Sequence, residues 1–97
     1  MTRNETITTL QREAGDFRDR GVTAMYLFGS IARNQARSSS DVDLFVDYDP
    51  ERFDFVELIR LRDRLSSVLG RPADLTTRQG LHPLLREKIE AEAIRVF

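Results

Sequence analysis

The chain has 97 residues, of which 40% are hydrophobic and 32% are charged. This length supports one domain with a single modest core, residues 1–97, and this balance is typical of a globular protein rather than of a disordered or membrane-embedded one. The 15 basic and 16 acidic residues nearly cancel, so we expect no direct binding to nucleic acid and no attraction to a membrane surface. The absence of cysteine excludes a disulfide framework and a thiolate zinc site.

The sequence contains no signal for a membrane or for export. No apolar run approaches the roughly 20 residues that a membrane-spanning helix needs. The first residues, MTRNETITTL, lack the basic and then apolar layout of a signal peptide. We therefore expect a cytoplasmic protein.

The first predicted element is a helix over residues 5–20, because its apolar residues recur at spacings of three and four. They are Ile7, Leu10, Ala14 and Phe17. Gly21 is expected to end this helix, and the apolar segment 22–28 that follows is typical of a buried strand.

A short helix over 30–35, a polar loop over 37–40 and a second strand over 41–47 come next. A long amphipathic helix is predicted over 54–69, ended by Gly70. The residues that mark it are Phe55, Val56, Ile59, Leu65, Val68 and Leu69.

A third strand over 73–76 and a last helix over 83–94 complete the chain, and the helix is expected to turn Leu84, Leu85, Ile89 and Ile94 inward. The order of elements is helix, strand, helix, strand, helix, strand, helix. It predicts a mixed α+β fold, in which a small sheet of three or slightly more strands packs against helices.

Asp41 and Asp43 are the first candidate site residues. Side chains alternate along a strand, so both carboxylates point to one face, about 6.6 Å apart along the chain. Two such carboxylates can share divalent cations, and oxygen ligands without sulfur favour magnesium or manganese. The competing interpretation is that Asp41 caps the loop while Asp43 pairs with an arginine.

Gly29 and Ser30 lie between the buried strand and the short helix. Free N–H groups at a helix start favour an anion, glycine lets a phosphate approach the backbone, and serine adds a hydroxyl donor. The alternative is that Ser30 is only a helix N-cap.

Asp74 is the third candidate, in the middle of the short strand PADLTT. If this strand lies beside the second one, Asp74 could face the same cations or accept a proton from an attacking hydroxyl. If it lies at a sheet edge, Asp74 could simply face water.

These residues together resemble a known family. Gly29 and Ser30, ten intervening residues and then Asp41-x-Asp43 are similar to the GSx10DxD signature of the DNA polymerase beta-like nucleotidyltransferases. The short chain, the stretches LFGSIAR and SDVDLFV, the ADL strand and the terminal AEAIRVF resemble the minimal nucleotidyltransferases, called MNT proteins. The likeness extends over almost the whole chain.

The resemblance implies a nucleotidyltransferase fold and a set of roles. Asp41 and Asp43 would bind two Mg²⁺ ions, Asp74 would complete the acidic triad, and Gly29 and Ser30 would hold the triphosphate of ATP. Arg33 matches the arginine of the frequent GSxAR pattern and could reach phosphate, or form an ion pair instead.

Two positions near this arginine depart from the family pattern. Ile31 stands where many relatives have arginine, and Asn34 stands where many have glycine. Asparagine tolerates a left-handed backbone, so the turn at Asn34 can be kept.

Many MNT proteins are antitoxins of HEPN proteins, so the implied reaction is transfer of AMP from ATP to a tyrosine hydroxyl of a HEPN ribonuclease toxin. Two other functions stay open. The chain could neutralise its partner by binding alone, with a contact surface that includes Phe53, Phe55 or Phe97, although packing in the core is the more ordinary use of such residues. It could also transfer a nucleotide to a small molecule, which usually requires an added substrate domain.

Overall fold

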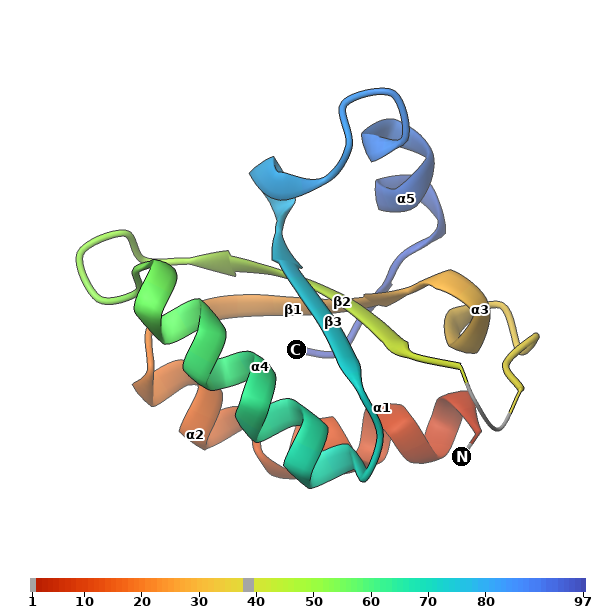
Figure 1. Ribbon diagram of the computed structural model, residues 1–97, viewed down its shortest axis with the longest axis horizontal. Coiled ribbons are helices and arrows are strands. Elements are labelled where there is room, and N and C mark those ends of the chain that lie inside the picture. The colour runs from red at the N-terminus through yellow and green to blue at the C-terminus, as the bar shows by residue number, and fades with distance from the viewer. Residues whose placement is uncertain (1, 38–39) are drawn as a thin grey trace.

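The computed structural model describes residues 2–37 and 40–97. Its centre is a four-stranded sheet with the strand order β3-β2-β1-β4 (Figure 1). The strands are β1 (Val22–Phe28), β2 (Val42–Tyr48), β3 (Ala73–Thr77) and β4 (Ile94–Arg95). The predicted α+β class and the first three strands are confirmed, each to within one residue at either end.

The sheet is mixed. β1 pairs with β2 and with β4 in antiparallel fashion, and β2 pairs with β3 in parallel. The parallel pair requires a crossover, and helix α4 (Phe55–Leu69) supplies it. The Asp54 side chain caps the start of α4 by accepting from the N–H of Glu57 (2.9 Å), and Gly70 ends it in a left-handed conformation.

The predicted first helix over 5–20 is two helices, α1 (Arg3–Arg12) and α2 (Ala14–Asp19), which separate at Glu13. Thr2 caps α1 by accepting from the N–H of Glu5. The apolar stripe is nevertheless continuous across the break, because Leu10, Ala14 and Phe17 are all buried.

The prediction for the last helix is wrong at both ends. Helix α5 covers only Arg86–Glu92, and the chain then becomes extended and forms β4. The N–H of Val96 donates to the carbonyl of Met25 (2.8 Å), so this segment satisfies backbone groups along the free edge of β1. Leu84 and Leu85, expected to point inward, are 87% and 51% exposed.

The two faces of the sheet have different surroundings. Helices α1, α2 and α4 lie together on one side, below the sheet in Figure 1, whereas α5 and the short 3₁₀ helix η1 (Arg78–Gly80) lie on the other. The main core fills the space between the sheet and helices α1, α2 and α4. Within residues 2–37 and 40–97, no helix is both long and apolar enough to cross a membrane.

Candidate active site

Strand β2 separates apolar from acidic side chains by simple alternation. Val42, Leu44 and Val46 are completely buried in the core beneath the helices. Asp43 and Asp47 point to the opposite face, on either side of Phe45. The buried apolar residues therefore fix the strand's orientation, and the carboxylates occupy the face that α1, α2 and α4 leave uncovered.

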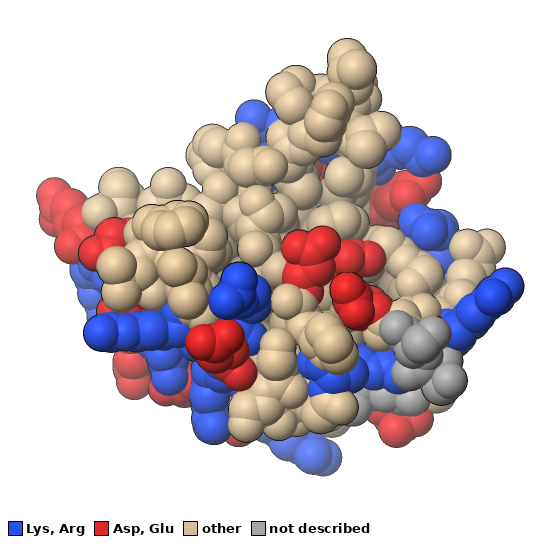
Figure 2. Space-filling model, in the orientation of Figure 1, with Lys and Arg blue, Asp and Glu red and all other residues tan. Residues whose placement is uncertain are grey.

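Asp43 and Asp74 are directly paired across the parallel β2–β3 ladder. Adjacent residues in such a ladder point to the same face, so the two carboxylates are neighbours. Asp41 lies one residue before β2 and is exposed to solvent. Acidic side chains gather near the middle of the face in Figure 2, where β2 and β3 run in Figure 1. The structure thus places Asp43 beside Asp74, with Asp41 near enough for its charge to act on Asp43.

The environment of Asp43 disfavours its charged form. The pKa of the Asp43 carboxyl is raised above its usual range. Partial burial is the largest cause, and repulsion from Asp74 and from Asp41 adds to it, while the positive charge of Arg33 only partly opposes the shift. No ion pair joins Asp43 to an arginine in the described part of the chain, so the alternative in which Asp43 is a paired structural aspartate is not what the structure has.

Gly29 lies against this carboxylate. Its φ is +76°, and a Cβ atom at this position would collide with the Asp43 carboxyl group. Phe28 is the residue of β1 that pairs with Asp43, so Gly29 is the first residue beyond that pair. Glycine is required here both by the backbone conformation and by the close approach of the carboxylate.

Ser30 lies inside α3 (Gly29–Ala32), and the capping position is occupied by Phe28. Ser30 is therefore not the N-cap, and the N-cap alternative is wrong. Because α3 has only four residues, its dipole is small, and an anion would be held by individual N–H groups and by the Ser30 hydroxyl.

Arg33 follows α3 and stays near the acidic cluster. Its Nε donates to Gln35 Oε1 (3.1 Å), and its Nη1 lies 3.7 Å from Glu92 Oε2 of α5. The arginine thus forms the ion pair that the sequence left as one option, while its side chain remains about half exposed. Asn34 has φ +56°, which confirms that asparagine maintains the left-handed turn.

A second charged group on the same face was not predicted from the sequence. Arg78 donates from Nε and Nη2 to both carboxylate oxygens of Asp47 (2.8 Å each) and from Nη1 to Glu90 of α5 (2.9 Å). Its guanidinium lies over the rings of Tyr26 and Phe45, at 4.9 and 5.0 Å from their centroids. This Arg78 network ties α5 to the sheet and covers one end of the acidic face.

The chain is similar to proteins of a known family. Residues 10–96 match the family model described as a nucleotidyltransferase domain. An inferred protein adenylyltransferase of Methanocaldococcus jannaschii is 40% identical over 77 residues, which cover 79% of this chain and 82% of the relative. The protein adenylyltransferase MntA of Thermococcus cleftensis is 30% identical over 97 residues, covering 99% of this chain and 97% of its own.

Solved structures share the fold. One described as a minimal nucleotidyltransferase superposes with a TM-score of 0.80 at 34% identity, covering 97% of this chain and 95% of the other. A toxin–antitoxin complex with AMP-PNP (TM-score 0.72, 22% identity, 100% and 73% covered) shows the same fold. So does an MNT antitoxin in complex with a tri-AMPylated HEPN toxin of Shewanella oneidensis (TM-score 0.69, 18% identity, 99% and 72% covered).

The chain therefore belongs to the nucleotidyltransferase domain family, whose members are enzymes that transfer a nucleotidyl group. Within this class it is a minimal nucleotidyltransferase, related to the protein adenylyltransferases of the MntA type.

Proposed function

We propose that this protein transfers AMP from ATP to a tyrosine hydroxyl of a HEPN-domain toxin and thereby neutralises it. The observation that carries the proposal is the register of β2 and β3, which sets Asp43 beside Asp74 on the face that the core helices leave uncovered. Gly29 lies against the Asp43 carboxyl group and Asp41 is near enough for its charge to act on Asp43, so the groups that we assign to phosphate are adjacent to the carboxylates. The adenylyltransferase relatives and the toxin–antitoxin structures support this particular reaction.

The acidic cluster fits a magnesium site. Burial, and after it the repulsion from Asp74 and Asp41, raises the pKa of Asp43, and a divalent cation would remove that repulsion. No three carboxylate or imidazole side chains among residues 2–37 and 40–97 form a ligand group by themselves. Mg²⁺ usually takes one or two carboxylates per ion and completes its coordination with phosphate oxygens and water, so three carboxylates can serve two ions only together with the phosphates of a nucleotide.

We assign the metal to Asp41, Asp43 and Asp74, which would hold two Mg²⁺ ions. When bound, these ions would supply Lewis acidity at the triphosphate and neutralise its charge. The chain's own groups have separate tasks. Gly29 leaves room beside Asp43, Ser30 donates a hydroxyl to a phosphate oxygen, and Arg33 lends positive charge at the rim.

Asp74 is the group we assign to the acceptor. It lies on the edge strand β3 and is exposed, so a hydroxyl from another protein can approach it from solvent. An ionised carboxylate there can accept the hydroxyl proton as the oxygen attacks the α-phosphorus of ATP, with pyrophosphate as the leaving group.

The test is incubation of the protein with labelled ATP, Mg²⁺ and a purified HEPN protein from the same genome. We expect label on the HEPN protein, at least about 10³-fold less with the Asp41→Asn/Asp43→Asn variant, because two charges that stabilise the reacting phosphate are removed. Equal labelling by this variant would overturn the proposal.

The same variant separates transfer from neutralisation by binding alone. If cells that express the HEPN toxin are still protected by the double variant, binding and not AMP transfer is what neutralises the toxin.

A further inference from the structure

Three apolar side chains at the start of α4 face solvent. Phe55 is 72% exposed, Val56 53% and Ile59 37%. The helix buries Leu61, Leu65 and Leu69 instead, so its first turns carry apolar residues that the core does not use. Single exposed apolar residues are ordinary, but a contiguous group is typical of an interaction site.

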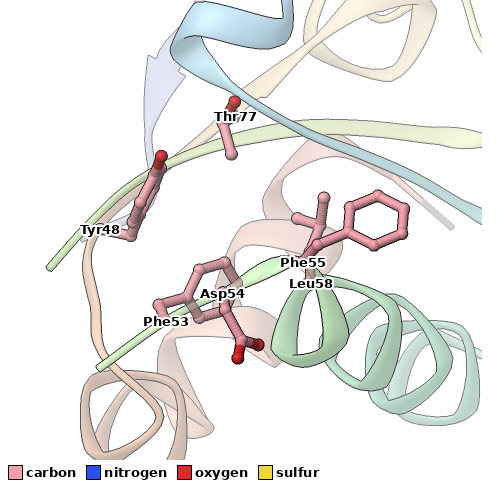
Figure 3. Close-up of a pocket in the computed structure, with 6 residues that line it drawn as sticks. All are labelled: Tyr48, Phe53, Asp54, Phe55, Leu58 and Thr77. Atoms are coloured by element: carbon pink, nitrogen blue, oxygen red, sulfur yellow. The ribbon is translucent and has the colours of Figure 1, made fainter. Parts of the chain in front are cut away.

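A small cavity adjoins these residues. It has a volume of about 210 Å³, and Tyr48, Phe53, Asp54, Phe55, Leu58 and Thr77 line it (Figure 3). Pockets for small-molecule ligands usually measure about 300–1,000 Å³, so this one is undersized for a nucleotide and suits a single apolar side chain. We call the three exposed residues and this cavity the α4 surface.

The α4 surface lies next to the strand that carries Asp74. Thr77, at the end of β3, contributes to the cavity and lies three positions after Asp74, or about 10 Å along the strand. β3 is an edge strand, so no further strand of the sheet blocks the way around its open edge from the cavity to Asp74. A protein seated on the α4 surface would reach around the edge of β3 to the acidic cluster.

The acceptor is not supplied by a second copy of this chain. The chain has two tyrosines, Tyr26 and Tyr48. The Tyr26 ring is stacked on Phe45 (centroids 4.8 Å apart) beneath Arg78, and Tyr48 packs against Phe53 (5.5 Å). Both side chains are half-buried in the sheet, so neither can extend into the site of another molecule.

We propose that the α4 surface is where the acceptor protein docks, with one of its apolar side chains in the cavity, so that its tyrosine is delivered along the β3 edge to Asp74. This inference rests on the proposed function for the identity of the acceptor, a HEPN-domain toxin. The contact supplies affinity for the partner and leaves the nucleotide site unchanged.

The experiment measures by calorimetry, without ATP, how tightly a purified HEPN protein from the same genome binds Phe55→Glu and Phe55→Lys. Phe55 is exposed at the first position of α4, so both variants should keep the fold, which thermal melting verifies. We expect at least about tenfold weaker binding with either charge, as for an anchor residue in an interface, and unchanged affinity for AMP-PNP. Leu84→Glu is the matched control, since Leu84 is also an exposed apolar side chain but lies two residues before α5, which is on the other side of the sheet from α4 (Figure 1).

Wild-type affinity in the Phe55 variants, an equal loss in Leu84→Glu, or no binding of the HEPN protein to the wild type would each overturn the α4 surface as its docking site. Binding that Phe55→Glu weakens, combined with no AMP transfer by the wild type, would retain the docking site and overturn the proposed reaction instead.

Discussion

Asp43 and Asp47 lie on the same face of β2, about 13 Å apart along the strand, yet their environments are opposite. Hydrogen bonds from Arg78 hold the pKa of Asp47 below its usual range, whereas burial and the repulsion from Asp74 and Asp41 raise the pKa of Asp43. Asp47 is paired with an arginine, as a structural carboxylate usually is. Asp43 instead lies near two other negatively charged carboxylates. The difference indicates that Asp47 stabilises the fold, whereas Asp43 is available to bind a cation.

The largest effect is expected at Asp74, which tests whether the acidic cluster works as a unit. Replacement of Asp74 by Asn removes the proton acceptor while keeping the size of the side chain. AMP transfer to the HEPN protein should fall by about 10²–10⁴-fold in rate, the usual contribution of a positioned general base. Asp63→Asn, an exposed aspartate on α4, is the control and should transfer at the wild-type rate. A wild-type rate in Asp74→Asn would show that Asp74 has no part in AMP transfer.

The second prediction concerns the Arg78 network. Arg78→Met leaves Asp47 and Glu90 without their shared donor and removes the guanidinium from the Tyr26 and Phe45 rings. We expect the free energy of unfolding to drop by about 1.5–3 kcal/mol, the range for hydrogen bonds to charged groups. Urea titration measures this loss.

Arg60→Met provides the contrast, because the Arg60 side chain is 66% exposed and its ion pair with Glu57 should contribute less than about 1 kcal/mol. Equal losses in the two variants would show that the Arg78 network is no more than a surface ion pair.

The smallest effect is a gain in stability from Asp43→Asn. The folded protein holds the Asp43 proton more tightly than the unfolded chain does, so the ionised aspartate destabilises the fold at pH 7, and this cost disappears as pH falls below about 4. In the absence of divalent cations, Asp43→Asn should be more stable than the wild type at pH 7 by no more than about 1 kcal/mol, because Asp43 is partly exposed and solvent screens the repulsion. Denaturation curves at pH 7 and at low pH measure the difference, which should vanish at low pH.

Asp47→Asn has the opposite sign. The lowered pKa of Asp47 means that its contribution is present at neutral pH and is lost as pH falls through the folded-state value. This variant should therefore be less stable than the wild type at pH 7 and approach it in acid. Matching pH profiles for the two variants would contradict the contrast between Asp43 and Asp47.

The position of Asp43 beside Asp74 could be predicted from the sequence because the signals for it are local. Alternation along an apolar strand sets the direction of Asp43, and the spacing between Gly29-Ser30 and Asp41 matches a family signature. The neighbouring position of Asp74 required only that β3 lie beside β2. What the sequence did not show is why Gly29 is glycine, since that depends on the Asp43 carboxylate reaching it across the ladder.

The C-terminal part was predicted poorly because tertiary contacts decide it. Ile94 continues the apolar spacing of a helix, but the free edge of β1 offers it strand pairing instead. Arg78 carried no local signal, since every basic residue except Lys88 is arginine. Periodicity also marked Phe55 as part of an apolar stripe without showing that the core leaves it exposed.

The most direct test of the separate roles of Asp43 and Asp47 is a paired measurement on Asp43→Asn and Asp47→Asn. For each variant it records the melting temperature, and also single-turnover AMP transfer to the HEPN protein at a temperature below both melting temperatures. We predict that Asp43→Asn stays as stable as the wild type or gains stability but loses transfer, whereas Asp47→Asn melts earlier and still transfers AMP. Transfer at the wild-type rate by Asp43→Asn, or equal loss of transfer in both folded variants, would contradict the separation of the two carboxylates.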